Sequence, residues 1–353
     1  MERGASVRRP VASAVRPDAD LQEIRRRLVE SGDLDESAAL SLRSTIDSRL
    51  GRGYSIDGGG QHWVLHRADD DHDGIETELS VQVALGGAAV VPVPDIVQRG
   101  TGASRYYLAR RVAGTVLRTD IDLDAVPVPL RNALGYQFVD SLTSVHGVDL
   151  TGTGLDRLRA DEPSLEVHLA QVHESLERAG ITARPDLREL FDSLAATIPR
   201  SGRSVLRHGD YQLRNVVWQL ADAVRVSAVL DWRYATVGDP FVDLGVAQVF
   251  WSGLHGVRNR LFGCPSAHRG YPSFEQLVER YSERSGFRIS STEMSWYYAF
   301  GFLVVAARIC GSGRPSSPTG TVGHVGMEAV ITPLVTRGIA AIEGNILSTA
   351  SCR

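Results

Sequence analysis

The segment spanning residues 207–245 most constrains what this chain can fold into, because it sets polar side chains beside short apolar runs. It reads Arg-His-Gly-Asp-Tyr-Gln-Leu-Arg-Asn, and further on Leu-Asp-Trp and Gly-Asp-Pro-Phe-Val-Asp-Leu. Residues 216–218 and 224–230 have strand character, and the gap between them is long enough for a hairpin turn. The base of a hairpin brings its end residues together. We therefore expect Asn215 and Asp231 to lie close to each other, with Asp210 in the loop before them.

These three side chains match the oxygen ligands that Mg²⁺ prefers: one or two carboxylates, an amide oxygen, and phosphate or water oxygens for the remaining positions. Chemistry on a magnesium-bound nucleotide needs such a set. One further carboxylate contacts the incoming hydroxyl. The spacing therefore predicts a metal site on Asn215 and Asp231, with Asp210 nearby.

The segment resembles the catalytic segment of the aminoglycoside phosphotransferase family, which also includes choline kinases and macrolide kinases. The shared pattern is His-Gly-Asp, four residues, Asn, a later Asp-Trp, Gly-Asp-Pro and Asp-Leu. His-Gly-Asp alone would equally suit a buried hydrogen-bonded pair or hydrolase metal ligands, but the full string is far more specific. The resemblance implies that Asp210 is the catalytic base and that Asn215 and Asp231 bind Mg²⁺. It assigns His208 and Asp243 to structural support of the catalytic loop.

The resemblance implies an α+β, two-lobed protein-kinase-like fold, with a small β-rich N-lobe and a larger, mostly helical C-lobe. We expect a disordered tail over 1–17, a nucleotide-binding lobe with leading helices over 18–113, and a catalytic and acceptor-binding lobe over 114–353. Helices are expected over 18–48, 131–200 and 239–347, with a helix beginning at Asp239-Pro240 because Asp is a good N-cap and Pro suits the first helical position.

The sequence contains no lysine, so all 38 Lys and Arg residues are arginines. Protein kinases hold the α- and β-phosphates with a lysine on the third strand, paired with a helix Glu. The corresponding strand here is 61–67, where His66 takes the basic position and Arg67 follows on the opposite face. Arginine binds phosphate through a bidentate fork. Arg67 could act if the strand slips by one residue or carries a bulge; otherwise metal and backbone hold the phosphates.

The rest of the predicted nucleotide site is carried by short motifs. The apolar positions of 74–85 suggest a strand when taken alone, but the resemblance implies a helix there, with Glu78, or alternatively Glu76, as the acidic partner. The glycines of 51–53 could approach a phosphate or form an ordinary turn. Residues 106–114 resemble the strand and hinge of the family, whose backbone would contact the base, and leave ATP or GTP open. The nucleotide-binding candidates are Gly51, Gly53, His66, Arg67, Glu78, Ala109, Arg110, Arg111 and Val112.

Composition agrees with a cytoplasmic enzyme. A net charge of −4 argues against nucleic acid as a partner. The three cysteines are far apart, which argues against a disulfide framework or a zinc site. The most apolar segment, 294–307, is too short to span a bilayer and predicts a buried helix. An amphipathic helix is expected over 134–149, with His146 as a packed structural residue. A homodimer is left open.

We therefore expect a small-molecule O-phosphotransferase that moves the γ-phosphate of ATP or GTP to a hydroxyl of an antibiotic or related natural product. The C-terminal region is rich in arginine, so a neutral or anionic acceptor is at least as favoured as a cationic one. Two alternatives remain. One is a pseudokinase that binds nucleotide without turnover, which the missing lysine motivates. The other is a metabolic kinase for a sugar, choline or homoserine.

Overall fold

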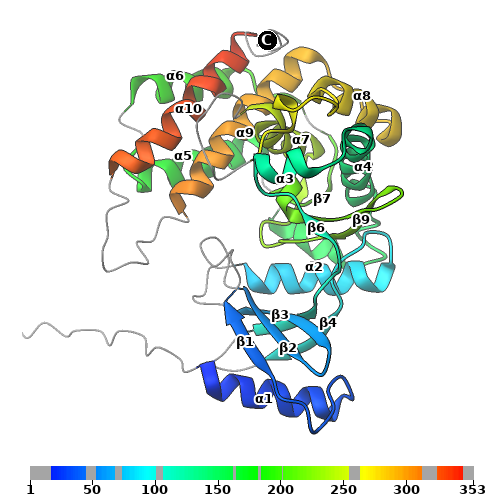
Figure 1. Cartoon of the computed structure of the whole chain (residues 1–353). Helices are drawn as coiled ribbons and strands as arrows, with labels where there is room; N and C mark the ends of the chain where they lie inside the picture. Colours follow the sequence, from blue (N-terminus) through cyan, green and yellow to red (C-terminus); the bar gives the residue numbers. More distant parts are fainter. Residues whose placement is uncertain are drawn as a thin grey trace, which may run out of the picture. The chain divides into compact units, whose positions relative to one another are not determined.

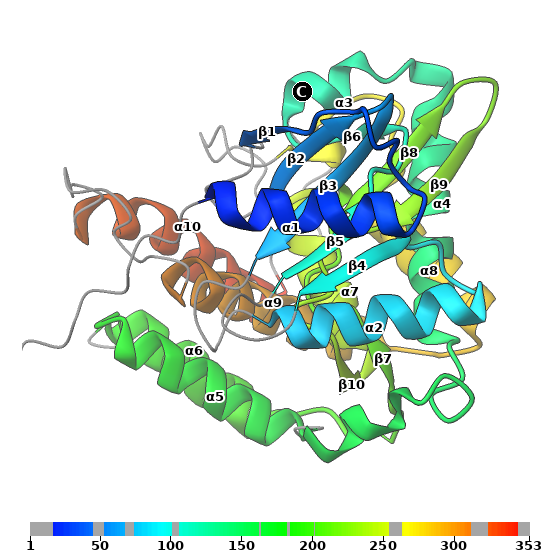
Figure 2. The same ribbon diagram turned by 90° about the horizontal axis from the view of Figure 1, so that it is seen from below.

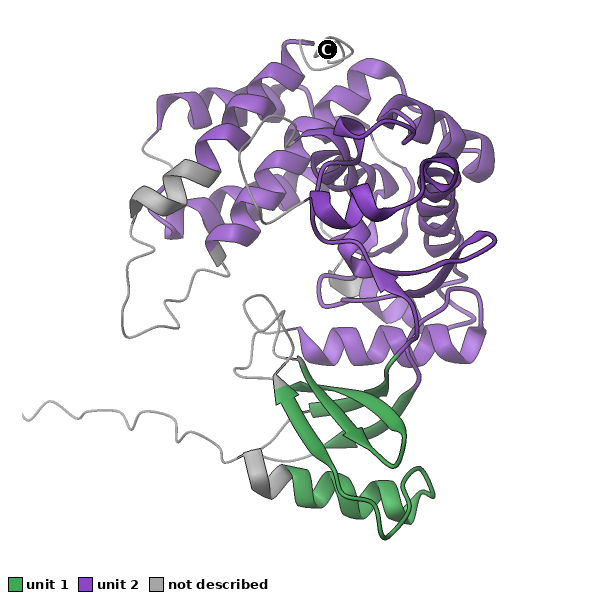
Figure 3. Ribbon diagram, viewed as in Figure 1, with its two compact units in different colours: residues 1–68, 96–111 green, residues 69–95, 112–353 purple. Residues whose placement is uncertain are grey.

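The computed structural model describes residues 17–44, 53–67, 74–100, 106–161, 164–181, 184–200, 202–253, 263–311 and 324–344. Its contacts divide the chain into two compact units (Figure 3). Unit 1 comprises residues 1–68 and 96–111, and unit 2 comprises residues 69–95 and 112–353. This division groups 69–95 with the second unit, whereas the predicted lobes place that segment in the first. Residues 1–16 of the tail expected over 1–17 lie outside the described residues, and Pro17 is the first residue of the helix α1.

Unit 1 is a five-stranded antiparallel sheet with one helix against it (Figure 1). The strand order is β1-β2-β3-β5-β4. Ile24 and Leu28 of the helix pack with Trp63 and Leu65 of the third strand in a separate small core. The elements are α1 (Pro17–Glu30), β1 (Ser41–Ser44), β2 (Gly53–Gly58), β3 (Gln61–Arg67), β4 (Ile96–Gly100) and β5 (Tyr106–Arg110).

The expectation of helices over 18–48 is correct for α1 and wrong for residues 41–44. Those four residues form β1, which pairs antiparallel with β2 from Ser41 opposite Asp57 to Ser44 opposite Tyr54. The sequence 41–44 is short and without a clear period. The neighbouring strand therefore decides its conformation, as is common where local propensity is weak.

Unit 2 carries two small sheets and many helices around a large core (Figures 1 and 2). One sheet has the order β6-β8-β9, and the other pairs β10 with β7. The strands are β6 (Thr115–Val116), β7 (Val205–Arg207), β8 (Val216–Leu220), β9 (Val224–Val229) and β10 (Thr236–Gly238). The α-helices are α2 (Ile75–Ala88), α3 (Asp120–Ala125), α4 (Val128–His146), α5 (Leu165–Arg178), α6 (Pro185–Ala196), α7 (Pro240–Gln248), α8 (Phe274–Ser285), α9 (Ser291–Gly311) and α10 (His324–Ile342).

Helix α2 confirms the expectation that rested on the family resemblance, against the strand that its apolar pattern suggested. Its buried face includes Glu78, Val81, Gln82 and Leu85, which follow helical spacing. Two of these four residues are polar, and apolar Val83 is 40% exposed. Hydrophobicity therefore does not follow burial along this helix, which is why the sequence pattern alone gave the wrong period.

Other predicted elements of unit 2 are confirmed. The hairpin of β8 and β9 forms as expected, and α4 buries Leu134, Phe138 and Leu142 along one face. Helix α7 begins at Pro240, and the Asp239 carboxylate caps it by accepting a hydrogen bond from the Phe241 amide at 2.8 Å. The predicted buried helix over 294–307 is part of α9. No helix in the described part of the chain is long and apolar enough to cross a membrane.

Helices α7 and α9 approach closely because a glycine stands on each. A Cβ added at Gly301 would lie 2.5 Å from the backbone carbonyl of Gly245, and one added at Gly245 would lie 2.1 Å from the Tyr297 carbonyl oxygen. Both distances are far below any real contact with backbone. The close packing fixes α7, whose first turn carries Asp243.

We expect Gly301→Ala to destabilise unit 2 by about 1–3 kcal/mol, because the methyl group has to push the two backbones apart. Gly87→Ala on α2 is the matched control, since a Cβ there meets no atom within 4 Å. This control should be neutral or stabilising, because alanine favours a helix interior by about 1 kcal/mol. Denaturant unfolding of the two variants measures the difference. Equal stability of both variants would contradict the packing described here.

Candidate active site

The backbone of the predicted catalytic loop is held by one buried carboxylate. Strand β7 leads into the loop, and Asp243 of α7 accepts hydrogen bonds from the backbone amides of His208 at 2.7 Å and Gly209 at 2.9 Å. Gly209 has φ 84°, and a Cβ there would lie 2.2 Å from the Tyr234 carbonyl oxygen. Only glycine fits this position. The backbone that carries Asp210 is therefore fixed from both sides.

His208 links the loop to the end of β9. Its ring is fully buried, Nδ1 accepts a hydrogen bond from the Asp210 amide at 3.2 Å, and Nε2 donates to the Leu230 carbonyl at 2.8 Å. A backbone amide can only donate and a carbonyl can only accept, so the ring is the neutral tautomer protonated at Nε2. Both nitrogens are engaged with backbone. His208 therefore supports the loop and has no position from which to exchange a proton with a substrate.

A second histidine completes the support of Asp243. His146 of α4 places Nε2 3.3 Å from an Asp243 carboxylate oxygen and Nδ1 2.7 Å from the Tyr281 hydroxyl. Burial by itself raises the pKa of Asp243, but the hydrogen bond from His146 and the nearby positive charge, Arg207 included, lower it to about 2. The carboxylate is thus ionised when it accepts the loop amides. His146 is a packed structural residue, as the sequence predicts.

Asp210 is 6% exposed and each of its carboxylate oxygens has a donor. Oδ2 accepts from Gln212 Nε2 at 2.8 Å and from Asn215 Nδ2 at 3.1 Å. Oδ1 accepts from Arg308 Nη1 of α9 at 3.0 Å. Gln212 and Arg308 are not among the site residues that the sequence predicts. The sequence hints at a role for Arg308 only through its position, because it is a charged residue directly after the most apolar segment, 294–307.

The hairpin brings the two predicted metal ligands to its base. The Leu230 amide donates to the Asn215 carbonyl at 2.8 Å, so Asp231 follows directly beside Asn215. The Asn215 amide nitrogen donates to the Asp210 backbone carbonyl at 2.8 Å and to its side chain, which leaves the amide oxygen as the acceptor. Asp231 has φ 64° and one oxygen 2.6 Å from Arg233 Nε. An amide oxygen and a carboxylate suit Mg²⁺, so the donor set fits the predicted metal.

Arg233 connects this carboxylate to the predicted acidic helix residue. Although burial lowers the pKa of Arg233, the charges of Asp231 and Glu78 raise it overall. Glu78 on α2 is 4% exposed and receives a hydrogen bond from Gln82 Nε2 at 3.4 Å. Within unit 2, Glu78 therefore interacts electrostatically with Arg233, two residues after the predicted metal ligand Asp231.

The nucleotide-binding candidates of unit 1 lie on two faces of its sheet. The His66 ring stacks on Tyr107 at 4.5 Å with an interplanar angle of 6°. Trp63 and Leu65 belong to the core formed with α1, and strand alternation places Arg67 on that same face. This placement favours His66 over Arg67 as the residue on the sheet face away from α1, and the assignment stays a prediction.

The predicted hinge is partly engaged in the sheet. Arg110 pairs with Asp33, and the Arg111 amide donates to the His62 carbonyl at 3.0 Å. Ala109 is buried in β5, and Gly53 in β2 lies opposite His66. Val112 is the first residue of the chain after unit 1. Gly51 lies outside the described residues.

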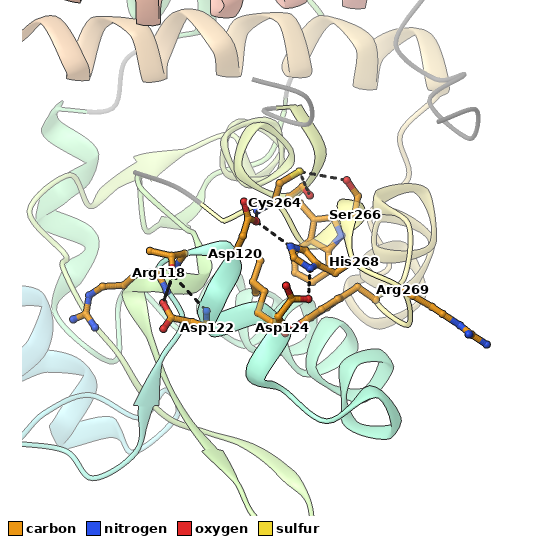
Figure 4. A network of polar contacts seen from close by, with 12 residues as sticks. Arg118, Asp120, Asp122, Asp124, Cys264, Ser266, His268 and Arg269 are labelled. Atoms are coloured by element: carbon orange, nitrogen blue, oxygen red, sulfur yellow. Dashed lines mark hydrogen bonds and ion pairs between the residues drawn. The ribbon is translucent and has the colours of Figure 1, made fainter. Parts of the chain in front are cut away.

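A second polar cluster surrounds His268 (Figure 4). Its ring lies between two carboxylates of α3, with Nδ1 2.8 Å from Asp124 and Nε2 3.0 Å from Asp120. Asp120 also accepts a hydrogen bond from the Cys264 amide at 2.9 Å. The cluster ties α3 to the segment that precedes α8. Across the ranges that the structure describes, no three His, Cys, Asp or Glu side chains gather closely enough to hold a metal ion.

Solved structures share this architecture. A putative aminoglycoside phosphotransferase from Ralstonia eutropha superposes with a TM-score of 0.71 at 21% identity, covering 93% of this chain and 98% of that one. The macrolide 2'-phosphotransferase from Brachybacterium faecium gives a TM-score of 0.55 at 21% identity, covering 90% and 98%. The fold is therefore the kinase-like fold of small-molecule phosphotransferases, as the sequence predicts.

The model of the phosphotransferase enzyme family matches residues 46–272, and the chain belongs to this family. Acyl-CoA dehydrogenase family member 11 from Gallus gallus is 26% identical over 283 residues, which are 76% of this chain and 36% of that protein. Hygromycin-B 4-O-kinase from Escherichia coli is 25% identical over 248 residues, 67% of this chain and 68% of that protein. The chain thus spans about a quarter to a third of the length of the acyl-CoA dehydrogenase relatives. The predicted family is therefore confirmed, and the alcohol acceptor stays a prediction.

Proposed function

We propose that the protein transfers the γ-phosphate of ATP or GTP to a hydroxyl group of a small molecule, an antibiotic or a related natural product. Asp210 is the catalytic base. The observation that carries this proposal is the fixed position of its carboxylate, which Gln212 and Asn215 orient through Oδ2. A base held within hydrogen-bond reach of the hydroxyl typically contributes about 10²–10⁴-fold to the rate.

Asn215 and Asp231 would hold Mg²⁺, whose charge, when bound, offsets the charge of the phosphates. The residues themselves supply the positioning: Asn215 contacts both Asp210 and the end of β9, so the base and the metal ligands are parts of one hydrogen-bonded loop. Within unit 1, His66 and the backbone of 109–111 are the proposed nucleotide contacts.

Relatives support the choice of donor and acceptor. Structures of aminoglycoside phosphotransferase APH(4)-Ia hold AMP-PNP or ADP together with hygromycin B, and an aminoglycoside 2'-phosphotransferase holds GDP. Hygromycin-B 4-O-kinase is among the curated relatives. A metabolic hydroxyl acceptor is the second candidate, because relatives named as acyl-CoA dehydrogenase family members match at similar identity.

The test is a coupled assay with Mg²⁺ that compares ATP with GTP against aminoglycosides, macrolides, nucleoside antibiotics, sugars, choline and homoserine. Mass spectrometry identifies a product heavier by one phosphoryl group. Such a product from an antibiotic class supports the proposal in full, and one from a metabolite supports the second candidate. Nucleotide binding without any product would favour the pseudokinase alternative. Asp231→Asn, with Asp222→Asn on the exposed hairpin as the control, separates metal-dependent turnover from contamination.

A further inference from the structure

An arginine donates a hydrogen bond to the Asp210 oxygen that the acceptor hydroxyl would have to reach. Arg308 Nη1 lies 3.0 Å from Asp210 Oδ1, and the guanidinium lies 4.7 Å from the centre of the Tyr234 ring. The two charged side chains are 20% and 8% exposed. The ion pair is therefore largely removed from water, at a position where the proposed function requires access for the acceptor.

The other two hydrogen bonds to the Asp210 carboxylate indicate which of its oxygens accepts the proton of the acceptor hydroxyl. Oδ2 already accepts from two amide groups, those of Gln212 and Asn215. A general base has to come within hydrogen-bond distance of the proton that it removes. Oδ1 is then the oxygen for the acceptor hydroxyl. The Arg308 N–H group that donates to Oδ1 therefore has to find another acceptor when the hydroxyl binds.

The other carboxylates of the segment 207–245 that the site draws on are poorly placed to bind a cationic acceptor. Asp231 pairs with Arg233, Asp239 accepts from the Tyr297 hydroxyl at 2.8 Å, and Asp243 pairs with His146. Each of these carboxylates already has a donor within the protein. A polycation would have to displace those donors, whereas an anion would find a cation already present.

Two arginines, Arg207 and Arg308, act electrostatically on the buried His168. His168 of α5 lies 3.5 Å from Arg207 Nη1. Burial and the charges of Arg207 and Arg308 lower the pKa of His168 to about 3. Arg308 itself uses one of its five N–H donors on Asp210, and among the described residues it has no second hydrogen-bond partner. A planar guanidinium can bind the two oxygens of a carboxylate or phosphate at once.

We propose that Arg308 recognises the acceptor, and that the acceptor carries an oxyanion, a carboxylate or a phosphate ester, near the hydroxyl that is phosphorylated. This inference rests on the proposed function. The oxyanion takes the guanidinium donors and leaves Oδ1 of Asp210 to the hydroxyl. The hydroxyl proton then moves to Oδ1, its oxygen forms a bond to the γ-phosphorus, and the bond from that phosphorus to the bridging oxygen of the nucleoside diphosphate breaks.

Binding measurements test this without turnover. Isothermal titration of the full chain, with Mg²⁺ and AMP-PNP present, compares glycerate and glycerol 3-phosphate with neutral glycerol and cationic ethanolamine. We expect at least one of the two anions to bind the wild type more tightly than the neutral and cationic compounds. Arg308→Gln should weaken that binding about 10- to 100-fold, the loss expected for a charge-assisted bidentate contact. A preference for one anion shows whether carboxylate or phosphate is recognised.

The matched control is Arg280→Gln on α8, which also removes an arginine paired with a carboxylate, Asp140, at 2.8 Å. It should leave anion binding unchanged. Arg308→Lys keeps the charge without the planar fork, and should bind with intermediate affinity even if Arg308→Gln unfolds. Equal anion affinity in wild type and both Arg308 variants, or no preference of the wild type for anions, would overturn the inference. Intact anion binding without product from any hydroxyl acceptor would overturn the proposed function alone.

Discussion

Asp210→Asn should lower kcat at least about 100-fold and up to about 10⁴-fold, while the protein stays folded. The replacement keeps the shape of the side chain but removes the carboxylate that takes the hydroxyl proton. The amide oxygen can still accept from Gln212 or Asn215, so the loop keeps part of its hydrogen bonding. The measurement is the turnover of the best acceptor at saturating nucleotide, with circular dichroism as the check on folding.

Asp222→Asn is the control for this experiment, because Asp222 is exposed in the turn between β8 and β9. It makes the same chemical change on the hairpin that follows the catalytic loop, and we expect wild-type kcat. A near-native kcat for Asp210→Asn would contradict the assignment of the base. Equal losses in the two variants would instead show that the hairpin tolerates no change.

Asp243→Asn should destabilise the protein by about 3–5 kcal/mol, the cost of breaking a fully buried charged network. Asp243 is wholly buried and accepts from the amides of His208 and Gly209 and from His146. An asparagine has one acceptor oxygen in place of two, and its amide group would face other donors. Because the loop amides lose an acceptor, we also expect the folded fraction of Asp243→Asn to have a lower kcat.

Denaturant unfolding at neutral pH measures this effect, with Asp140→Asn as the control. Asp140 also pairs with an arginine, Arg280, but that arginine side chain is 36% exposed. Exposed ion pairs contribute about 0–1 kcal/mol. A loss for Asp243→Asn no larger than that of the control would contradict the role of Asp243 as the support of the loop.

The same carboxylate predicts how stability depends on pH. The pKa of Asp243 falls from 3.8 to about 2 on folding. A lowered pKa contributes stability that is fully present above the unfolded value and is lost as the pH falls through the folded value. This shift corresponds to about 2 kcal/mol, which the wild type should lose between about pH 4 and pH 2. Asp243→Asn should lack this part of the acid dependence. If the free energy of unfolding fell by the same amount in both proteins over this pH range, the assignment of the acid dependence to Asp243 would be wrong.

The sequence by itself determined the local part of the site. The order of Asp210, Asn215 and Asp231, with strand-forming runs on both sides of a turn, predicts the hairpin that the structure shows. Asp239 and Pro240 predict the beginning of α7. These features all lie in the single segment 210–240 of the chain. Chain geometry and capping therefore fix them without help from the rest of the fold.

Tertiary structure decided the partners of these residues. Arg308 reaches Asp210 across 98 positions of the chain, and His146 reaches Asp243 across 97. Strand β1 forms because β2 lies beside it, and α2 buries Glu78 and Gln82 where a hydrophobic pattern expects apolar residues. No spacing in the sequence encodes which distant side chain will meet a carboxylate. Helix packing sets those distances, and here the glycine contact of α7 with α9 fixes the helix that carries Asp243 against the helix that carries Arg308.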